Sequence, residues 1–523
     1  MKQRTKQIAI WFWRLTLLLL ALVGIAMVGC SLPPPNGRTV SQALSPQDSA
    51  ATTLGKALAA EQQQHSNLSG VYLLGDAREA FAARVKLAMQ AEKTLDVQYY
   101  IWHGDTTGTL LLEALHDAAE RGVRVRLLID DHGTSGLDGA LAAMDAHPNI
   151  EVRLFNPFVF RPFKLFGFVT DFTRANRRMH NKSFTADNAA TILGGRNVGD
   201  EYFGATDGVL FADLDALAVG AVVPEVSLSF DAYWSSASAY PVSTVIPPAS
   251  AAILQAAQEH SSVVEHSSAA ATYKQAIMDM AFVSKLVQRS LPMEWAPTQF
   301  IVDAPSKGLA QAKNSELLLH HIGETIGKPQ QSLDLVSPYF VPTDAGSDYF
   351  VNLAKQGVRV RILTNSMAAT DVLAVHSGYA RYRQRLIEGG VLLYEMKPNA
   401  NNMQNDGVGF MGSSGSSLHA KTFGADDKRM FVGSFNFDPR SAKLNTELGM
   451  VVHSAKFGQQ MDDAFANAIP QRSWQVVEDG NGDIVWLDHA QQPPQQLTTE
   501  PMSSWWQRAS VAVLSLLPIE WML

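Results

Sequence analysis

A short motif occurs twice in this chain of 523 residues, each time with the same internal spacing. Each copy reads His-x-Lys-x4-Asp and is followed by a glycine and an asparagine. Corresponding residues in the two copies are 239 positions apart (419 minus 180). Repetition of five residue types at one offset indicates that a whole folding unit has been duplicated. The five pairs are His180 and His419, Lys182 and Lys421, Asp187 and Asp426, Gly194 and Gly433, and Asn197 and Asn436.

The segments around the two motifs repeat the same alternation of extended and helical patterns. Runs rich in Val, Ile and Leu predict strands, and apolar residues at helical spacing predict the helices between them. We therefore expect an α/β fold of two duplicated domains, each with a mixed β-sheet flanked by helices, related by a pseudo-twofold axis. The expected strands are 95–101, 123–129 and 152–157 in the first half and 333–336, 357–363 and 391–398 in the second, and the expected helices are 107–120 and one that ends near residue 355.

The length of the chain is too great for one ordinary core, so two domains with terminal extensions are predicted. The hydrophobic fraction of 46% suits a folded protein. The predicted parts are an export signal at 1–29, a tether at 30–70, a first domain at 71–250, a helical connector at 251–300, a second domain at 301–490 and a C-terminal membrane-interacting tail at 491–523.

The start of the chain has the pattern of an export signal. Cationic residues precede an apolar run that ends at Cys30, the only cysteine, so internal disulfides and Cys-based zinc sites are excluded. Residues 27–30, Met-Val-Gly-Cys, resemble the lipobox of bacterial lipoproteins, whose cysteine is acylated, and Ser31 favours the outer membrane because it is not an acidic retention signal. The alternative is an uncleaved transmembrane anchor at 8–29. Both interpretations predict a membrane-attached protein of the bacterial cell envelope that faces the periplasm.

The charge of the chain bears on its partners. Lys and Arg number 42 against 50 Asp and Glu, which gives a net charge of −8. A general nucleic-acid binder is more often basic, because neutralisation of phosphates by cations dominates that affinity. We therefore expect no nucleic-acid partner.

The spacing within each motif brings an imidazole and an ammonium group together. Residues two apart in an extended segment point to the same side, so His180 and Lys182 project together, as do His419 and Lys421. Histidine can attack phosphorus or protonate a leaving oxygen near neutral pH, and lysine balances phosphate charge. Small residues after each motif would let the backbone approach a phosphate. We predict that both copies meet at the axis and form one site, although a single copy could equally be an ordinary strand pair.

The two motifs resemble the HKD signature of the phospholipase D superfamily, and their Gly-x-x-Asn tails match its extended form. The resemblance runs from about residue 54 to the C-terminus and extends to bacterial cardiolipin synthases of the C type. The segments that carry it are LDVQYYIW at 95–102, RMHNKSFT at 178–185, GGRN at 194–197 and GSFNFDPRS at 433–441.

The resemblance implies a ping-pong phosphatidyl transfer that needs neither a metal nor an organic cofactor. One motif histidine attacks the phosphodiester to form a phosphatidyl-histidine, and the other protonates the leaving alcohol and then activates the acceptor. The family often assigns the nucleophile to the first motif, so we expect it to be His180. The motif residues expected in the catalytic site are His180, Lys182, Asp187, His419, Lys421 and Asp426.

Other polar residues are expected to support this chemistry. Asn197, Asn436 and Ser434 are expected near the phosphate, where the asparagines and the motif lysines would bind its non-bridging oxygens. The two motif aspartates are expected to hold their loops by accepting hydrogen bonds. An acid also precedes a later strand in each half, Asp213 and Glu447. These two carboxylates either orient the histidines or lie solvated at the strand ends.

Three segments bear on the substrate. Residues 155–178 mix phenylalanines with cations, which suits an anionic lipid surface or, alternatively, a buried loop with a cationic rim. Residues 505–521 are apolar with several tryptophans and could lie on a bilayer or pack on the second domain. Residues 399–417 are rich in Asn, Gly and Ser and predict a mobile loop or lid. The phenylalanines and cations are Phe155, Phe158, Phe160, Phe163, Phe166, Phe168, Phe172, Arg161, Lys164, Arg174, Arg177 and Arg178.

Three functions are therefore considered. The favoured one is a membrane-attached phosphatidyltransferase that makes cardiolipin from phosphatidylglycerol and a second phospholipid. The second is a hydrolase of the same superfamily, a phospholipase D or an exported nuclease, and the third is a binding protein that has lost its chemistry. The expected partners are phospholipid substrates and the bilayer, and the sequence makes no prediction of the oligomeric state.

Overall fold

The computed structural model describes residues 37–161, 167–206, 210–278, 290–398 and 417–523, and also residues 13, 14, 32, 34, 164, 280 and 285. Cys30, nearly all of the predicted export signal and all but the last residue of the predicted lid at 399–417 lie outside the described residues.

The first half of the described chain builds a nine-stranded sheet in the order β10-β1-β8-β6-β5-β2-β3-β4-β9. Strands β2, β3 and β4 are parallel and the other neighbours are antiparallel. The strands are β1 (Ser69–Leu74), β2 (Thr94–Ile101), β3 (Arg124–Gly133), β4 (Ile150–Phe155), β5 (Ser183–Ala186), β6 (Ala190–Gly194), β8 (Asp215–Gly220), β9 (Ala239–Pro241) and β10 (Glu294–Ala296).

The second half builds a ten-stranded sheet among the described residues, in the order β11-β18-β17-β16-β12-β13-β14-β19-β20-β21. Here β12, β13 and β14 are parallel. The strands are β11 (Thr298–Val302), β12 (Ser332–Val336), β13 (Arg359–Asn365), β14 (Leu392–Met396), β16 (Thr422–Ala425), β17 (Arg429–Gly433), β18 (Leu448–Val452), β19 (Ser473–Glu478), β20 (Ile484–Asp488) and β21 (Gln495–Leu497).

The order and direction of the strands confirm the predicted duplication. The run β1-β8-β6-β5-β2-β3-β4-β9 corresponds strand by strand to β11-β18-β17-β16-β12-β13-β14-β19, with the same parallel and antiparallel pairings. A buried ion pair repeats as well. Arg126 Nε lies 2.6 Å from Asp96 Oδ1, and Arg361 Nε lies 2.6 Å from Asp334 Oδ1.

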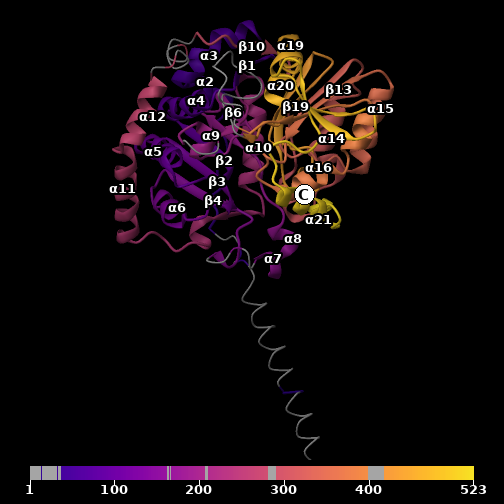
Figure 1. Ribbon diagram of the computed structural model, residues 1–523. Helices are drawn as coiled ribbons and strands as arrows, with labels where there is room; N and C mark the ends of the chain where they lie inside the picture. Colours follow the sequence, from indigo (N-terminus) through magenta and orange to yellow (C-terminus); the bar gives the residue numbers. More distant parts are fainter. Residues whose placement is uncertain are drawn as a thin grey trace, which may run out of the picture.

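The two halves lie side by side (Figure 1), and they share an apolar core. One apolar cluster contains Val71 and Leu193 from the first sheet together with Val432 and Met450 from the second. Burial of such side chains contributes about 1.5–3 kcal/mol each, so the two sheets are expected to stabilise one another. The shared core holds the inner strands of the halves, and therefore the ends of those strands, in a fixed relation.

Helices flank both sheets, as the apolar spacing predicted. Helix α5 (Thr106–Glu120) begins after Asp105, whose carboxylate accepts a hydrogen bond from the Gly108 amide, and α15 (Thr343–Lys355) is its counterpart in the second half. Helices α11 (Ala251–Glu265) and α12 (Ser268–Met278) follow the first half, and α11 packs on α5 and on α6 (Asp138–Asp145). Near the C-terminus, α21 (Trp505–Leu514) packs on α16 (Leu373–Ala380).

Candidate active site between the two halves

The two motifs lie where the halves meet, and the residues just before each motif pair with the other half, Met179 with Thr446 in an isolated bridge and β15 (Ser417–Leu418) with β7 (Phe211–Ala212). His180 and Lys182 directly precede β5, and His419 and Lys421 directly precede β16. The amide of His180 donates to the Thr446 carbonyl at 2.9 Å, and the amide of His419 donates to the Ala212 carbonyl at 2.7 Å. These bonds are pseudo-symmetric, so both histidines enter one site.

Each motif histidine is held by a carboxylate from the opposite half. His180 Nδ1 lies 2.8 Å from Glu447 Oε2 and 3.1 Å from the Ser434 carbonyl. His419 Nδ1 is hydrogen-bonded to Asp213 Oδ2. Both acids are buried and lie against the histidines, so the alternative of solvated carboxylates at the strand ends does not hold. Because Nδ1 is occupied in both rings, Nε2 is the nitrogen that each histidine can offer to a substrate.

The motif lysines are buried beside the histidines. Lys182 Nζ donates to the His180 carbonyl at 2.5 Å, and Lys421 Nζ donates to the His419 carbonyl. Burial lowers the pKa of Lys182 to about 7 and the pKa of Lys421 to about 8. Two ammonium groups in a buried site form a strong electrostatic attraction for a phosphate.

Burial also lowers the pKa of both motif histidines, but their carboxylate partners differ. The pKa of His180 lies well below its usual value because the ring is desolvated and close to Lys182 and Lys421. Burial raises the pKa of its partner Glu447 to about 7. Desolvation also acts on Asp213, but the charges of His419 and Lys421 outweigh it and hold the Asp213 pKa below its usual value. The carboxylate beside His419 is therefore more fully ionised than the carboxylate beside His180.

The residues after each motif have roles other than simple phosphate binding. Asn197 Oδ1 accepts from the Ile101 amide at 3.2 Å, and its Nδ2 donates to the Tyr202 hydroxyl at 3.1 Å. Asn436 is buried, and its Oδ1 has no partner among the described residues. The Ser434 hydroxyl donates to Glu447, so this serine supports the carboxylate that holds His180.

The glycines are explained by strand packing, which corrects the prediction that they admit a phosphate. A Cβ atom on Gly194 would lie 2.3 Å from Asp215 Oδ1, and one on Gly433 would lie 2.4 Å from the Leu448 carbonyl. A Cβ on the neighbouring Gly195 would lie 2.1 Å from Asp213 Oδ1. The protein itself occupies these spaces, so the missing side chains let β8 and β18 approach closely.

The motif aspartates hold loops, as expected of them, and stand apart from the chemistry. The Asp187 carboxylate accepts from the backbone amides of Glu92, Lys93 and Thr94 at 2.8–2.9 Å. The Asp426 carboxylate accepts from the amides at 330, 331 and 332 in the same way. Among the contacts of the described residues, neither aspartate touches a motif histidine or lysine, so their place in the catalytic set is corrected.

Aromatic rings that sequence reasoning did not single out line the site. Tyr100 lies edge to face against His180, with ring centroids 5.0 Å apart, and the Lys182 ammonium lies 5.6 Å from the Tyr100 centroid. Tyr202 and Phe211 contact His419 with centroids 5.3 and 5.1 Å away. These rings desolvate the histidines. A signal for one of them was present in the sequence, because Tyr100 and Tyr339 also differ by 239 positions.

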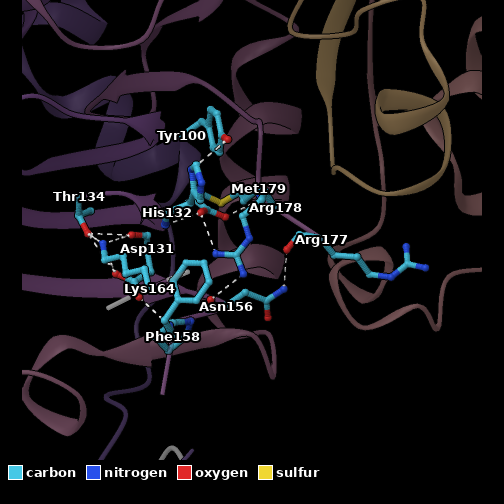
Figure 2. Close-up of polar contacts among 12 residues, drawn as sticks. Tyr100, Asp131, His132, Thr134, Asn156, Phe158, Lys164, Arg177, Arg178 and Met179 are labelled. Carbon is cyan, nitrogen blue, oxygen red and sulfur yellow. Dashed lines mark hydrogen bonds and ion pairs between the residues drawn. The ribbon is translucent and has the colours of Figure 1, made fainter. Parts of the chain in front are cut away.

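A side chain at the end of a parallel strand fixes the residue before each histidine. In the first half, Asp130 accepts from the Met179 amide at 2.7 Å and lies 3.2 Å from Arg178 Nη1. In the second half, Asn365 accepts from the Leu418 amide at 2.9 Å and donates to its carbonyl at 3.0 Å. Figure 2 shows Arg178 and Met179 beside His132 in this part of the site.

The segment at 155–178, predicted to be either a lipid-facing surface or a buried loop with a cationic rim, has features of both. Phe155 and Phe158 are buried, whereas Phe160 and Phe172 are 50% and 40% exposed. Phe163 and Phe166 lie outside the described residues. The cations are less free than predicted, because Arg161 and Lys164 form ion pairs with Asp131. Asp130 and Asp131 were not considered in the prediction, since they come from β3.

Groups able to hold a metal ion lie apart from the motif residues. Within the described ranges, three clusters place their possible ligand atoms within 4.8 Å of one another, and none of them includes a motif histidine. The clusters are His116, Glu120 and His147; His103, Asp105 and Glu201; and Asp334, Asp427 and Asp462.

Two related α/β units that contribute one histidine and one lysine each to a shared site define a PLD-like protein. The family model described as "Cardiolipin synthase, PLD-like domain" matches residues 85–234 and 322–469. The chain is 46% identical to cardiolipin synthase C of Escherichia coli (strain K12), over 88% of this chain and 97% of that protein. The chain therefore belongs to the cardiolipin synthase family of PLD-like proteins, as its motifs predicted.

Two further proteins are similar to this chain. An uncharacterized protein of Helicobacter pylori (strain J99) is 32% identical over 82% of this chain and 84% of that protein. The crystal structure of phosphatidylserine synthase from Haemophilus influenzae Rd KW20 matches 89% of this chain and 100% of that chain with a TM-score of 0.56. At 13% identity this last likeness concerns the fold alone.

Proposed function

We propose that this protein is a phosphatidyltransferase that makes cardiolipin from phosphatidylglycerol and a second phospholipid through a phosphatidyl-histidine. The observation that carries the proposal is the pair of cross-half contacts, His180 with Glu447 and His419 with Asp213. They orient two imidazoles, each with its Nε2 available, beside two buried ammonium groups. Membership of the cardiolipin synthase family supports the same substrate class.

In the first step, His180 Nε2 attacks phosphorus while His419 Nε2 gives a proton to the departing oxygen. The lowered pKa of His180, caused by burial and by Lys182, keeps this ring neutral and therefore nucleophilic. Burial and Lys421 lower the pKa of His419, but the charge of Asp213 opposes this shift, so His419 is better suited than His180 to carry the proton of a general acid. The P–O bond to the leaving alcohol breaks as the N–P bond forms, and the alcohol leaves with the proton.

In the second step, the hydroxyl of the acceptor lipid enters on the side that the leaving alcohol has vacated. His419 Nε2 accepts the hydroxyl proton, the oxygen attacks phosphorus and the N–P bond breaks. Lys182 and Lys421 balance the charge on the non-bridging oxygens in both steps. The product has two phosphates and four acyl chains, and the enzyme returns to its starting protonation state.

The test supplies the purified protein with phosphatidylglycerol, with and without phosphatidylethanolamine, and identifies the products by mass spectrometry. We expect a lipid with two phosphates and four acyl chains, at a rate that chelators leave unchanged. His180→Ala and His419→Ala should each lose this activity, whereas His116→Ala on the surface of α5 should retain it. Formation of phosphatidic acid alone would instead support the hydrolase.

We propose that the protein works at a membrane surface and is attached through its N-terminal segment, by an acylated Cys30 or by an uncleaved anchor. Within the described part of the chain, no helix combines the length and apolarity that a transmembrane span needs. An exposed apolar face at the C-terminus supports contact with the bilayer. This interfacial face consists of Phe172, Trp505, Trp506, Leu516, Leu517 and Trp521.

The interfacial face joins two segments for which the sequence had suggested lipid contact. Phe172 of α8 (Phe172–Ala175) contacts Trp521 of η7 (Glu520–Met522), with ring centroids 6.1 Å apart. Figure 1 shows α7 (Gly167–Thr170), α8 and α21 at the same end of the molecule. Trp505 and Trp506 are 70% and 65% exposed there, although Val511 of the same helix is buried. Helix α21 thus packs on the second half with one face and leaves its tryptophans outward.

A further inference from the structure

Two tyrosines at equivalent positions of the site have different partners. Tyr100 and Tyr339 are 239 positions apart (339 minus 100); Tyr100 lies near the end of β2, and Tyr339 lies three residues after the end of β12. The Tyr100 hydroxyl lies 3.3 Å from His132 Nδ1, whereas the Tyr339 hydroxyl donates to Asp371 Oδ2 at 2.7 Å. His132 and Asp371 are exposed and are themselves 239 positions apart (371 minus 132). The pseudo-symmetric site is therefore chemically unequal at its rim.

The His132 side holds cations that are paired with Asp130 and Asp131. Figure 2 shows His132 between Tyr100 and Arg178, with Lys164 nearby. Although part of the ring is exposed, the protein packed around it and the charges of Arg178, Lys164 and Arg440 lower the pKa of His132 to about 4. His132 is therefore neutral and offers no charge to a substrate at this side of the rim.

The Asp371 side is negative. Among the residues that the structure describes, no Lys, Arg or His lies within ion-pair distance of the Asp371 carboxylate, and its recorded side-chain partner is the Tyr339 hydroxyl. The Asp371 carboxylate lies close enough to Lys421 and Tyr202 to oppose the lowering of the Lys421 pKa by burial and to add to the raising of the Tyr202 pKa by burial, and the Tyr202 ring contacts His419. A carboxylate repels phosphate but accepts hydrogen bonds from hydroxyl and ammonium groups.

We propose that Asp371, held in place by Tyr339, binds the alcohol side of the reaction. Its carboxylate accepts hydrogen bonds from the hydroxyl or ammonium group of the headgroup that leaves, and then from the free hydroxyl of the glycerol headgroup that accepts the phosphatidyl group. This inference rests on the proposed function, in which His180 attacks and the alcohol departs toward His419 in line with the attacking nitrogen. The rim of the second half thereby becomes the alcohol subsite, and water competes poorly for it.

The experiment compares the full-length protein with Asp371→Asn, Tyr339→Phe and the control Asp344→Asn, an exposed aspartate of α15. One substrate is phosphatidylglycerol in mixed micelles, and the other is a phosphatidyl ester of p-nitrophenol, whose leaving group has no hydroxyl or ammonium group for a carboxylate to bind. We expect Asp371→Asn to lower kcat/KM for phosphatidylglycerol about tenfold or more, as loss of a charge-assisted hydrogen bond predicts. The nitrophenol burst of Asp371→Asn should change by less than about threefold. Tyr339→Phe should also lower kcat/KM for phosphatidylglycerol more than it changes the nitrophenol burst, but by a smaller factor than Asp371→Asn.

The product ratio provides a second measurement. Asp371→Asn should raise the fraction of phosphatidic acid at the expense of the lipid with two phosphates, while Asp344→Asn matches the wild type. An unchanged ratio together with an unchanged kcat/KM, or an equal loss on both substrates, would overturn the inference. If the wild type makes phosphatidic acid alone, the proposed transferase function fails. The role of Asp371 is then decided by whether its substitution harms phosphatidylglycerol selectively over the nitrophenyl ester.

Discussion

Glu447 and His180 are 267 positions apart in the chain, yet their side chains form a 2.8 Å hydrogen bond at the centre of the molecule. The bond fixes the ring through Nδ1 and directs Nε2 into the site. His419 and Asp213 form the reciprocal bond, so neither half contains both the histidine and the carboxylate of such a pair. Each half supplies one imidazole and orients the other, which makes a single active site from a duplicated fold.

The assignment of His180 as the nucleophile predicts different behaviour of the two histidines with an activated substrate. A phosphatidyl ester of p-nitrophenol has a leaving group that needs little protonation. We expect His419→Ala and Asp213→Asn to release a burst of nitrophenol close to one equivalent, whereas His180→Ala releases none. Stopped-flow absorbance measures the burst, and peptide mass spectrometry should find the phosphatidyl group on His180. A burst from His180→Ala with none from His419→Ala would reverse the assignment.

The buried lysines predict an alkaline loss of activity. Burial lowers the pKa of Lys182 to about 7 and that of Lys421 to about 8, so their charges are lost as the pH rises through this range. We expect kcat/KM to fall between about pH 7 and 8.5. The kcat should fall at higher pH, because bound phosphate favours the ammonium forms. Steady-state kinetics as a function of pH measures both the fall in kcat/KM and the fall in kcat.

The same lysines provide a control that separates this loss from unfolding. Between a folded pKa near 7 or 8 and an unfolded value near 10.4, the unfolded state binds more protons than the folded state. Their contribution to the free energy of unfolding therefore rises with pH over this window. Urea unfolding should show no loss of stability from these two groups where activity falls. Lys182→Arg, which replaces the lysine with the lower pKa, should move the start of the alkaline fall in kcat/KM to higher pH if the loss of charge is the cause.

The Asp187 carboxylate is predicted to affect stability and not chemistry. Asp187→Ala leaves three backbone amides without an acceptor and places alanine at a φ of 52°. We expect the free energy of unfolding to fall by about 2–4 kcal/mol. At temperatures where the variant is folded, kcat should stay within about threefold of the wild type. Asp187→Asn, which tolerates this φ, should lose less stability, and a 100-fold fall in kcat of folded Asp187→Ala would contradict the structural role.

The interfacial face predicts a defect in membrane binding that is separate from catalysis. Trp505→Ser with Trp506→Ser removes two exposed rings, each expected to contribute on the order of 1–2 kcal/mol of partitioning. The proteins are compared without their first 36 residues. Sedimentation with phosphatidylglycerol vesicles should show that the double variant binds at least about tenfold more weakly than the unsubstituted protein. Turnover of a dispersed short-chain lipid should not change. The matched control is Met89→Ser, which replaces an exposed apolar residue of α4 (Ala77–Gln90). Equal vesicle binding by the double tryptophan variant and this control would exclude the interfacial face as a membrane contact.

Sequence reasoning predicted more of the fold than of the rim of the site. The strands at 95–101 and 123–129 and the helix at 107–120 match β2, β3 and α5 closely, because their apolar periods are set by local geometry. The pairing of Asp213 with His419 was not predictable in detail, since the acids were known only as residues before a strand. The ion pairs that Asp131 makes with Arg161 and Lys164 were missed because Asp131 belongs to β3, which is distant in the sequence from the segment at 155–178.

The sequence by itself determined that the fold is duplicated, that the strands and helices alternate, and that each unit carries an imidazole and an ammonium group for phosphodiester chemistry. These properties follow from residue type and spacing. Only the tertiary structure decided that each histidine takes its carboxylate from the opposite half, that Gly194 and Gly433 make room for strands and that Tyr339 holds Asp371 at one rim. Such contacts depend on the shared core, which brings together strand ends more than 200 positions apart in the chain.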